Sequence, residues 1–164
     1  MSLRFTISSI RITMIIIGID PDTDKNGVSI WEKNNATLEL RSLDFFQLQD
    51  YLREQKEQIK IVKIEAGWLN KISNFRKTKG KAISDSIARK VGENHQAGKN
   101  IEKLCQHLQI DYRLVKPFKK NWGTKSGKIS HIQMMTHLAR LKIKLINIST
   151  NQDNRDSALI ALYG

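Results

Sequence analysis

Two aspartates near the end of the chain have the spacing of a shared site. Asp153 and Asp156 lie three residues apart at the head of the apolar run "SALIALYG". Side chains three or four residues apart occupy one face of a helix, with about 5–6 Å between their Cβ atoms. Two carboxylates held there repel each other unless positive charge lies between them. Acidic residues in a first helical turn also offset the helix dipole, and aspartate is a common cap, so the pair alone has an ordinary structural explanation.

Two further acids end predicted strands. Asp20 closes "MIIIGID", a short β-branched run that stops at the turn-rich "PDTDKNG", and Glu65 ends the strand in "IKIVKIEAG". If these strands lie side by side and parallel in mid-sheet, their carboxylates meet at one sheet edge, where a final helix can add the aspartate pair. Each acid alone has an ordinary explanation as a turn residue or ion-pair partner, but four at one edge do not.

Carboxylates that pack together are costly unless they bind cations. Ligand sets made only of oxygen suit Mg²⁺ or Mn²⁺. Two such ions about 3.5–4 Å apart activate a water and stabilise the leaving oxygen in phosphodiester hydrolysis. We therefore predict a catalytic, metal-binding set formed by Asp20, Glu65, Asp153 and Asp156.

The distribution of charge indicates a polyanionic partner. Residues 66 to 148 hold 18 of the 28 Lys and Arg but only four of the 16 acids, a net charge of +14, and the rest of the chain has −2. A near-neutral frame with a basic middle points to nucleic acid or an anionic membrane surface. No sustained basic amphipathic helix with a bulky apolar face stands out, so nucleic acid is favoured over a membrane.

Other classes of protein are disfavoured by composition. One cysteine, Cys105, excludes an internal disulfide framework, and no Cys/His cluster suggests zinc, so we expect a reducing, cytoplasmic location. The longest apolar run, at residues 14 to 19, is far shorter than the roughly 20 residues of a membrane span. Residues 1–13 have no small-residue cleavage site, and we interpret them as an N-terminal extension or a cloning remnant rather than a signal peptide.

The elements that must position the acids follow from hydrophobic spacing. We predict an α/β fold: a mixed five-stranded sheet, three antiparallel strands followed by two parallel ones, with helices on both faces. Asp44 and Ser130 are predicted helix caps, and a long helix is predicted from Ser84 to Leu108. The predicted strands are residues 14–20, 27–33, 36–43, 59–65 and 111–117.

At this point the sequence resembles the RuvC-type Holliday junction resolvases, within the RNase H and retroviral integrase superfamily. "IIIGIDPDTDKNGVSI", with Asp20 and Gly27, is similar to that family's first strand and hairpin, and "IVKIEAGW" to the strand with its glutamate. "DNRDSALIALYG" is similar to the closing helix, and "KKNWGTKSGKISHIQMM" to the basic loop and helix before it.

The resemblance covers residues 14–164 and implies an RNase H-like nuclease domain there. It implies a homodimer, associated with the nucleoid, that makes symmetric nicks across four-way DNA junctions in recombination and repair. The expected cofactor is Mg²⁺, as two ions with Mn²⁺ as a possible substitute; no small-molecule cofactor and no membrane partner is expected.

The resemblance also implies DNA contacts. Trp68, three residues after Glu65, stands where the family has an aromatic wedge for the opened junction centre, and Lys119, Lys120 and Lys128 lie near lysines that contact the scissile phosphate. A core or loop-anchoring tryptophan and a solvated basic face are the ordinary alternatives. The residues expected to bind DNA are Trp68, Lys71, Arg76, Lys77, Lys79, Lys81, Lys116, Lys119, Lys120, Lys125 and Lys128.

One departure and three alternatives remain open. Asp22 stands where the family usually has glycine, at a turn whose left-handed conformation aspartate tolerates better than most residues. The same acids would also serve a ribonuclease H acting on RNA–DNA hybrids, whereas a non-catalytic junction-binding protein would explain the charge but not the acids. An actin-like kinase also opens with a "GID" strand, but 164 residues are too few for its second domain.

Overall fold

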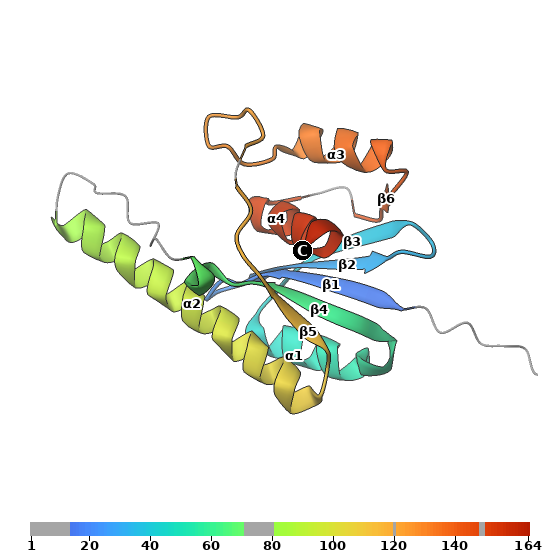
Figure 1. Ribbon diagram of the computed structural model, residues 1–164, viewed down its shortest axis with the longest axis horizontal. Coiled ribbons are helices and arrows are strands. Elements are labelled where there is room, and N and C mark those ends of the chain that lie inside the picture. The colour runs from blue at the N-terminus through green and yellow to red at the C-terminus, as the bar shows by residue number, and fades with distance from the viewer. Residues whose placement is uncertain (1–13, 71–80, 120, 148–149) are drawn as a thin grey trace, which may run out of the picture.

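The computed structural model of the protein describes residues 14–70, 81–119, 121–147 and 150–164. One mixed sheet carries helices on both of its faces (Figure 1). The strands are β1 (Ile15–Asp20), β2 (Asn26–Glu32), β3 (Thr37–Leu43), β4 (Ile59–Glu65), β5 (Tyr112–Val115) and β6 (Lys144–Leu145). The helices are α1 (Phe45–Glu54), α2 (Lys81–Leu108), α3 (His131–Arg140) and α4 (Gln152–Tyr163), with 3₁₀ turns η1 (Lys56–Gln58) and η2 (Gly67–Leu69).

The strand order is β5-β4-β1-β2-β3-β6. β1, β2 and β3 pair antiparallel, whereas β4 pairs parallel with both β1 and β5. This confirms the predicted mixed sheet and places β1 and β4 side by side within it. The structure adds a sixth strand, β6, whose two residues pair with Thr37 and Leu38 of β3. A two-residue edge strand is too short for hydrophobic alternation to reveal, which explains why the sequence predicted five.

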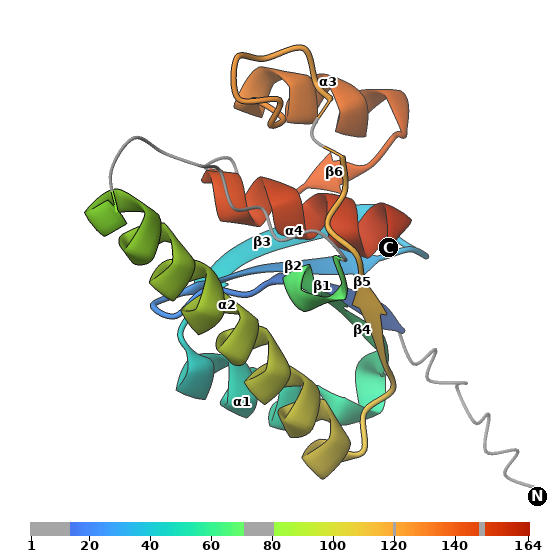
Figure 2. The same ribbon diagram turned by 60° about the vertical axis from the view of Figure 1, so that its left-hand side comes forward.

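The helices form layers above and below the sheet. Figure 2 shows α1 and α2 on one face and α4 on the other, with α3 stacked outside α4. The two predicted caps are confirmed: Asp44 and Ser130 each form a capping box with a glutamine three residues later. Within the described ranges, no helix combines the length and the apolar character needed to cross a bilayer.

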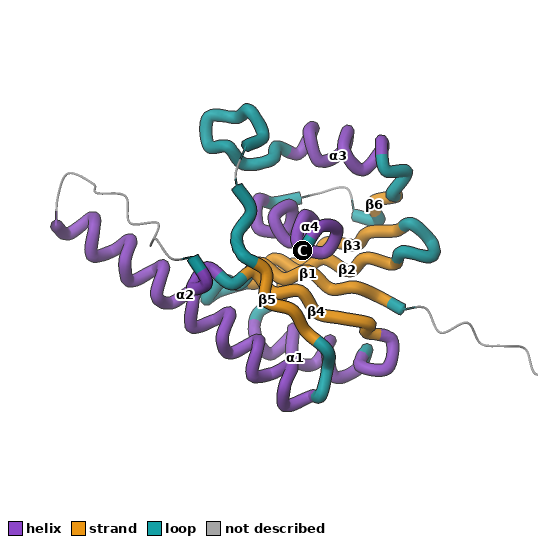
Figure 3. Tube along the Cα trace, viewed as in Figure 1, coloured by secondary structure: helices purple, strands orange, loops and turns teal. Residues whose placement is uncertain are grey.

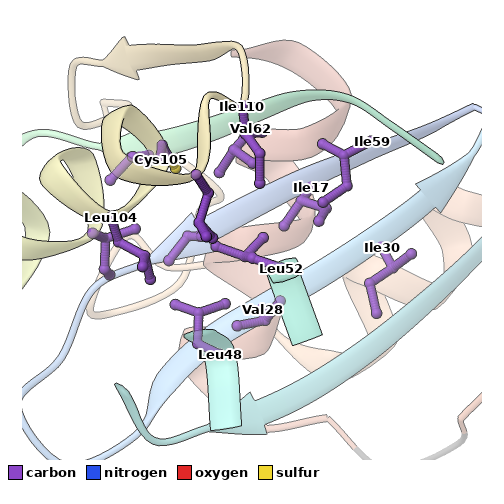
Figure 4. Close-up of a cluster of buried hydrophobic side chains, with 14 of the residues drawn as sticks. Ile17, Val28, Ile30, Leu48, Leu52, Ile59, Val62, Leu104, Cys105 and Ile110 are labelled. Atoms are coloured by element: carbon purple, nitrogen blue, oxygen red, sulfur yellow. The ribbon is translucent and has the colours of Figure 1, made fainter. Parts of the chain in front are cut away.

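The larger hydrophobic core lies between the sheet and the α1–α2 layer. Ile17, Ile19 and Val28 project from β1 and β2 and are fully buried. They meet Leu48 and Leu52 of α1 together with the inner face of α2 (Figure 4). Because side chains alternate along a strand, the intervening residues of β1 face α4 on the opposite side of the sheet.

Helix α4 lies directly on the sheet backbone because glycine occupies the contact positions. A Cβ atom added to Gly18 of β1 would lie 2.3 Å from the Ser157 carbonyl oxygen and 2.6 Å from the Ala161 amide nitrogen. At Gly27 of β2 it would lie 2.3 Å from the Asp153 carbonyl oxygen. The two glycines therefore admit the helix at a distance that any other residue would prevent.

Hydrogen bonds from the neighbouring strands hold α4 against the surface formed by Gly18 and Gly27, which we call the glycine floor. The buried Ser29 hydroxyl of β2 donates to the Ser157 carbonyl oxygen at 2.7 Å. On the other side, the buried Lys63 ammonium of β4 donates to the Ala161 carbonyl oxygen at 2.8 Å. Burial lowers the pKa of Lys63, and nearby Arg113 adds to that effect. Cations are favourable at helix C-termini, and here the lysine is supplied from below by the sheet.

The glycine floor predicts opposite effects of two Gly→Ala substitutions. Gly27→Ala must displace the backbone of α4, and we expect it to lower the free energy of unfolding by about 1–3 kcal/mol. Gly92→Ala, in the interior of α2 where an added Cβ meets nothing within 4 Å, should raise it by about 0.5–1 kcal/mol. Urea denaturation of both variants measures this. Equal effects of the two substitutions would contradict the close contact between Gly27 and the backbone of α4.

Candidate active site

Asp20 and Glu65 lie at the same edge of the sheet. The register pairs Ile19 of β1 with Ile64 of β4, so the next residue on each strand is one of the two acids. Gly18 and Lys63, two residues earlier on each strand, both face α4. Side chains alternate with a period of two, so Asp20 and Glu65 also lie on the α4 side of the sheet. This is the parallel, side-by-side arrangement that the sequence predicted.

Gly27 brings the terminal helix to these acids. It lies opposite Asp20 in the β1–β2 ladder, and its open α-carbon receives the backbone of Asp153 in the first turn of α4. The cap of α4 is Asn151, whose side-chain oxygen accepts from the Asn154 amide at 2.8 Å. Capping therefore does not explain the aspartate pair, although Asp153 still lies in the positive first turn.

Asp20 lies within electrostatic reach of the other three acids. The pKa of Asp20 is raised from 3.8 to about 8, first by burial of the carboxyl and then by the charges of Glu65, Asp156 and Asp153. Lys128 opposes this shift. The chain therefore gathers acids from β1, β4 and α4 around one partly buried carboxyl, which a purely structural arrangement would not need.

Lys128 brings a positive charge to this cluster. Its ammonium lies 3.7 Å from Asp156 Oδ2, and the Gln152 amide donates to the other oxygen, Asp156 Oδ1, at 2.8 Å. Arg155 of α4 fixes the loop that carries Lys128, because its Nε donates to the Ile129 carbonyl oxygen at 3.1 Å. The lysine is thus held at the acids by the same helix that supplies two of them.

The donor set fits a hard divalent cation in kind and in charge. Four carboxylates supply only oxygen atoms, and the raised pKa of Asp20 records negative potential that a cation would relieve. Among the residues that the structure describes, no three His, Cys, Asp or Glu side chains are grouped as they stand in a way that could hold one ion. If an ion is bound, Asp20, Glu65, Asp153 and Asp156 are the residues placed to hold it.

The segment between β5 and α3 passes beside α4 (Figure 3). A hollow beside the acids is lined by residues of this segment and of α4. Glu65, Asp156 and Lys128 line it at the acidic end. Lys119, Phe118 and Trp122 line the other side. Lys119 and Lys128 are therefore the predicted DNA contacts that the structure brings to the acids.

Trp68, the middle residue of η2, packs against α2. Its ring lies over Gly98, where an added Cβ would approach Trp68 Cζ3 to 2.5 Å, and its edge meets His95 with ring centroids 6.1 Å apart. The side chain is half-buried, whereas the next residue, Leu69, is 36% exposed. Trp68 thus anchors the end of β4 to α2, the ordinary role considered for it, next to Glu65.

The remaining predicted DNA contacts are scattered or undescribed. Lys116 and Lys125 are exposed but do not line the hollow at the acids. Lys71, Arg76, Lys77, Lys79 and Lys120 lie outside the described residues, as do the side chain of Lys81 and the N-terminal residues 1–13.

The turn at Asp22 forms without a left-handed backbone conformation at this residue. The described non-glycine residues with positive φ are Ala36, Gln109 and Lys142. Asp22 instead accepts a hydrogen bond from the Asp24 amide at 3.0 Å through Oδ1, an Asx-type turn. The aspartate therefore forms this turn without the left-handed conformation that the sequence analysis considered for it.

Comparison with known proteins bears on the fold. No protein-family model matches the chain, and no curated protein matches it by sequence. The structure of Thermus thermophilus RuvC in complex with a Holliday junction substrate is similar with a TM-score of 0.54, at 14% identity over 91% of each chain. The chain has a RuvC-like fold. Its RNase H-like sheet, predicted from the resemblance, is thus confirmed.

Two further structures are less similar. A second structure of T. thermophilus RuvC has a TM-score of 0.49, at 16% identity over 91% of this chain and 92% of that one. The yeast mitochondrial Holliday junction resolvase Ydc2 has a TM-score of 0.47, at 15% identity over 94% of this chain and 80% of that one.

Sequence reasoning missed several residues in and around this candidate site. Phe118 and Trp122 were passed over because the segment around them was interpreted through its lysines alone. Aromatic residues interleaved with lysines in "KPFKKNW" are the signal that was available. Lys63 and Arg155 left no such signal, because their roles depend on carbonyl groups that only the fold brings near.

The raised pKa of Asp20 predicts a pH-dependent stability in the absence of metal. The unfolded chain loses this proton near pH 4 and the folded chain only near pH 8, so the carboxyl makes folding less favourable as pH rises through that window. Asp20→Asn replaces the ionisable carboxyl with an amide that stays neutral throughout this pH range. Its free energy of unfolding in EDTA should exceed the wild-type value by an amount that grows by up to about 1.4 kcal/mol per pH unit.

Urea denaturation across pH 4 to 8 tests this, with Asp24→Asn as the control because Asp24 is an exposed acid of the same turn. A difference between Asp20→Asn and wild type that stays constant with pH would show that Asp20 does not share its surroundings with the other acids.

Proposed function

We propose that this chain is a metal-dependent endonuclease that hydrolyses phosphodiester bonds of branched DNA, with the four-way junction as its substrate. The observation that carries the proposal is the gathering of Glu65, Asp153 and Asp156 around the carboxyl of Asp20, beside Lys128, in a strongly basic protein. The RuvC-like fold supports it, because the similar Thermus protein was solved in complex with a Holliday junction.

The proposed roles follow from charge and position. Asp20, Glu65, Asp153 and Asp156 would hold divalent cations, Mg²⁺ with Mn²⁺ as a substitute. Such ions, when bound, supply water activation and charge stabilisation for phosphodiester hydrolysis. The carboxyls must be ionised to bind them. Lys119 and Lys128 line the same hollow and would attract and orient the phosphate next to the acids.

The choice of substrate rests on charge and symmetry. The basic middle of the chain neutralises phosphates and favours a large polyanion over a small phosphate ester. A junction that is to be resolved needs two nicks in symmetric positions, which two copies of this single acid set would supply as a homodimer. The same acids would also hydrolyse an RNA–DNA hybrid, so the substrate must be tested directly.

Asp20→Asn should separate binding from cleavage. The amide keeps the size of the side chain but removes a charged oxygen ligand and one source of repulsion toward phosphate. We expect junction binding to be retained or tighter and cleavage in Mg²⁺ to fall by at least about 100-fold. Gel assays would compare a labelled four-way junction with matched duplex, fork and RNA–DNA hybrid, with and without Mg²⁺.

Asp24→Asn is the matched control and should cleave like wild type. Undiminished nicking of the junction by Asp20→Asn would refute the site, and preferential cleavage of the hybrid would replace the junction by a ribonuclease H substrate. Binding that no metal changes, without any cleavage, would favour a non-catalytic junction-binding protein.

Trp68→Ala should slow cleavage more than it weakens binding. A tryptophan three residues after Glu65 could stack on an unpaired base, an interaction worth about 1–3 kcal/mol. In that role the ring would leave its seat on Gly98 and His95 when DNA binds. Single-turnover rates and junction affinity of Trp68→Ala and Trp68→Phe measure the effect, with Trp68→Phe expected to lie nearer wild type. An unchanged rate in Trp68→Ala would leave the ring with its anchoring role alone.

A further inference from the structure

The hollow at the acids continues into a second one along the C-terminal half of α4. Four residues line both: Phe118, Lys119, Trp122 and Leu159. Asn121 and Tyr163 extend the lining away from the acids. We call the surface formed by Phe118, Lys119, Asn121, Trp122, Leu159 and Tyr163 the aromatic groove. Its cavity volume is about 290 Å³, at the small end of the range of ligand sites.

The floor of the aromatic groove is held rigidly. The Trp122 amide donates to the Gly127 carbonyl oxygen at 3.1 Å, and the Trp122 carbonyl oxygen accepts from Gln133 Nε2 at 2.6 Å. The edge of the Trp122 ring meets His137, with centroids 5.5 Å apart, and His137 Nε2 lies 2.5 Å from the Tyr163 hydroxyl. Trp122 and Tyr163 are therefore fixed relative to each other through one histidine, which reduces the entropy that binding would cost.

The walls of the aromatic groove remain open to solvent. Phe118 is 38% exposed and Tyr163 is 52% exposed, whereas Trp122 packs against a second hydrophobic core that includes Met134 and Leu138. Exposed aromatic side chains that line a pocket and are rimmed by lysine are unlike a scattered surface phenylalanine. They present flat apolar faces next to a positive charge, the combination that single-stranded nucleic acid uses.

The charges at the two ends define the occupant. At one end Lys119 and Lys128 face the acids, where the proposed function puts a phosphate. Beyond the residues that line both hollows, the described lining adds only Asn121, which offers an amide, and Tyr163, which offers a ring with a hydroxyl group. A molecule that fits has an anionic group followed by a flat, neutral, hydrogen-bonding ring. That description matches a nucleotide whose base has left its helical stack.

We propose that the aromatic groove receives one unpaired nucleobase of the DNA strand whose phosphate lies at the acids. The inference rests on the proposed function, since it uses the same phosphate position. The base stacks on Phe118 and the Trp122 side of the groove while Lys119 contacts the backbone. The groove thereby fixes which nucleotide is held next to the cleaved bond. The Asn121 amide can form hydrogen bonds with the edge of the base, so the groove would prefer some bases over others.

An abasic scan tests the groove without relying on cleavage. Four-way junctions that lack a single base, at successive positions around the cleavage point, would be titrated with protein in EDTA and followed by fluorescence anisotropy. We expect one position at which loss of the base weakens wild-type binding by about 5- to 100-fold, the range that stacking supplies. Phe118→Ala should bind the intact junction more weakly and lose most of this sensitivity.

Phe46→Ala is the matched control, because Phe46 is a phenylalanine 75% exposed on α1, on the opposite side of the sheet. It should keep the wild-type profile, and Phe118→Tyr, which retains a ring, should keep it too. A flat scan in wild type, or an unchanged scan in Phe118→Ala, overturns the groove. Cleavage of the intact junction in Mg²⁺ is measured separately: absence of cleavage by wild type counts against the proposed function, whereas cleavage with a flat scan removes the groove alone.

Discussion

The contact between the backbone of α4 and two glycines is the constraint on which the site depends. Gly18 and Gly27 leave no side chain between sheet and helix, and Ser29 and Lys63 hold the helix from either side. The same close approach puts the first turn of α4 at the end of β1, where Asp20 lies. Acids separated by more than 130 residues of chain therefore meet through main-chain packing rather than through long side chains.

Ionising the clustered carboxyls lowers the free energy of unfolding, and contacts around the cluster offset this cost. Burial and three neighbouring carboxylates raise the pKa of Asp20 to about 8, and Lys128 is the opposing charge. The cost is tolerated because α4 is fixed elsewhere, by its core residues and by Arg155. Strained electrostatics on a rigid scaffold are typical of sites that bind ions or reacting groups.

Much of the fold and of the site could be predicted from the sequence. The β-branched run ending at Asp20 and the strand ending at Glu65 were placed correctly because burial on both faces leaves a clear apolar signal, and the caps Asp44 and Ser130 follow local rules. β6 was missed because two residues carry no period, and the anchoring seat of Trp68 depends on Gly98, thirty residues further along. The parts of the site assembled by tertiary contact, such as Lys63 beneath α4, had no local signature.

The identity of the cap on α4 has a further consequence. Asn151 satisfies the Asn154 amide with a neutral oxygen, whereas an aspartate there would have added a third acid to the start of the helix, beside Asp153 and Asp156. A neutral cap leaves the partial positive charge of the helix's opening turn uncancelled. That partial charge lies next to Asp153 and its neighbours. The peptide dipoles of α4 therefore stabilise the carboxylates without a bound ion, and this contribution does not change with pH.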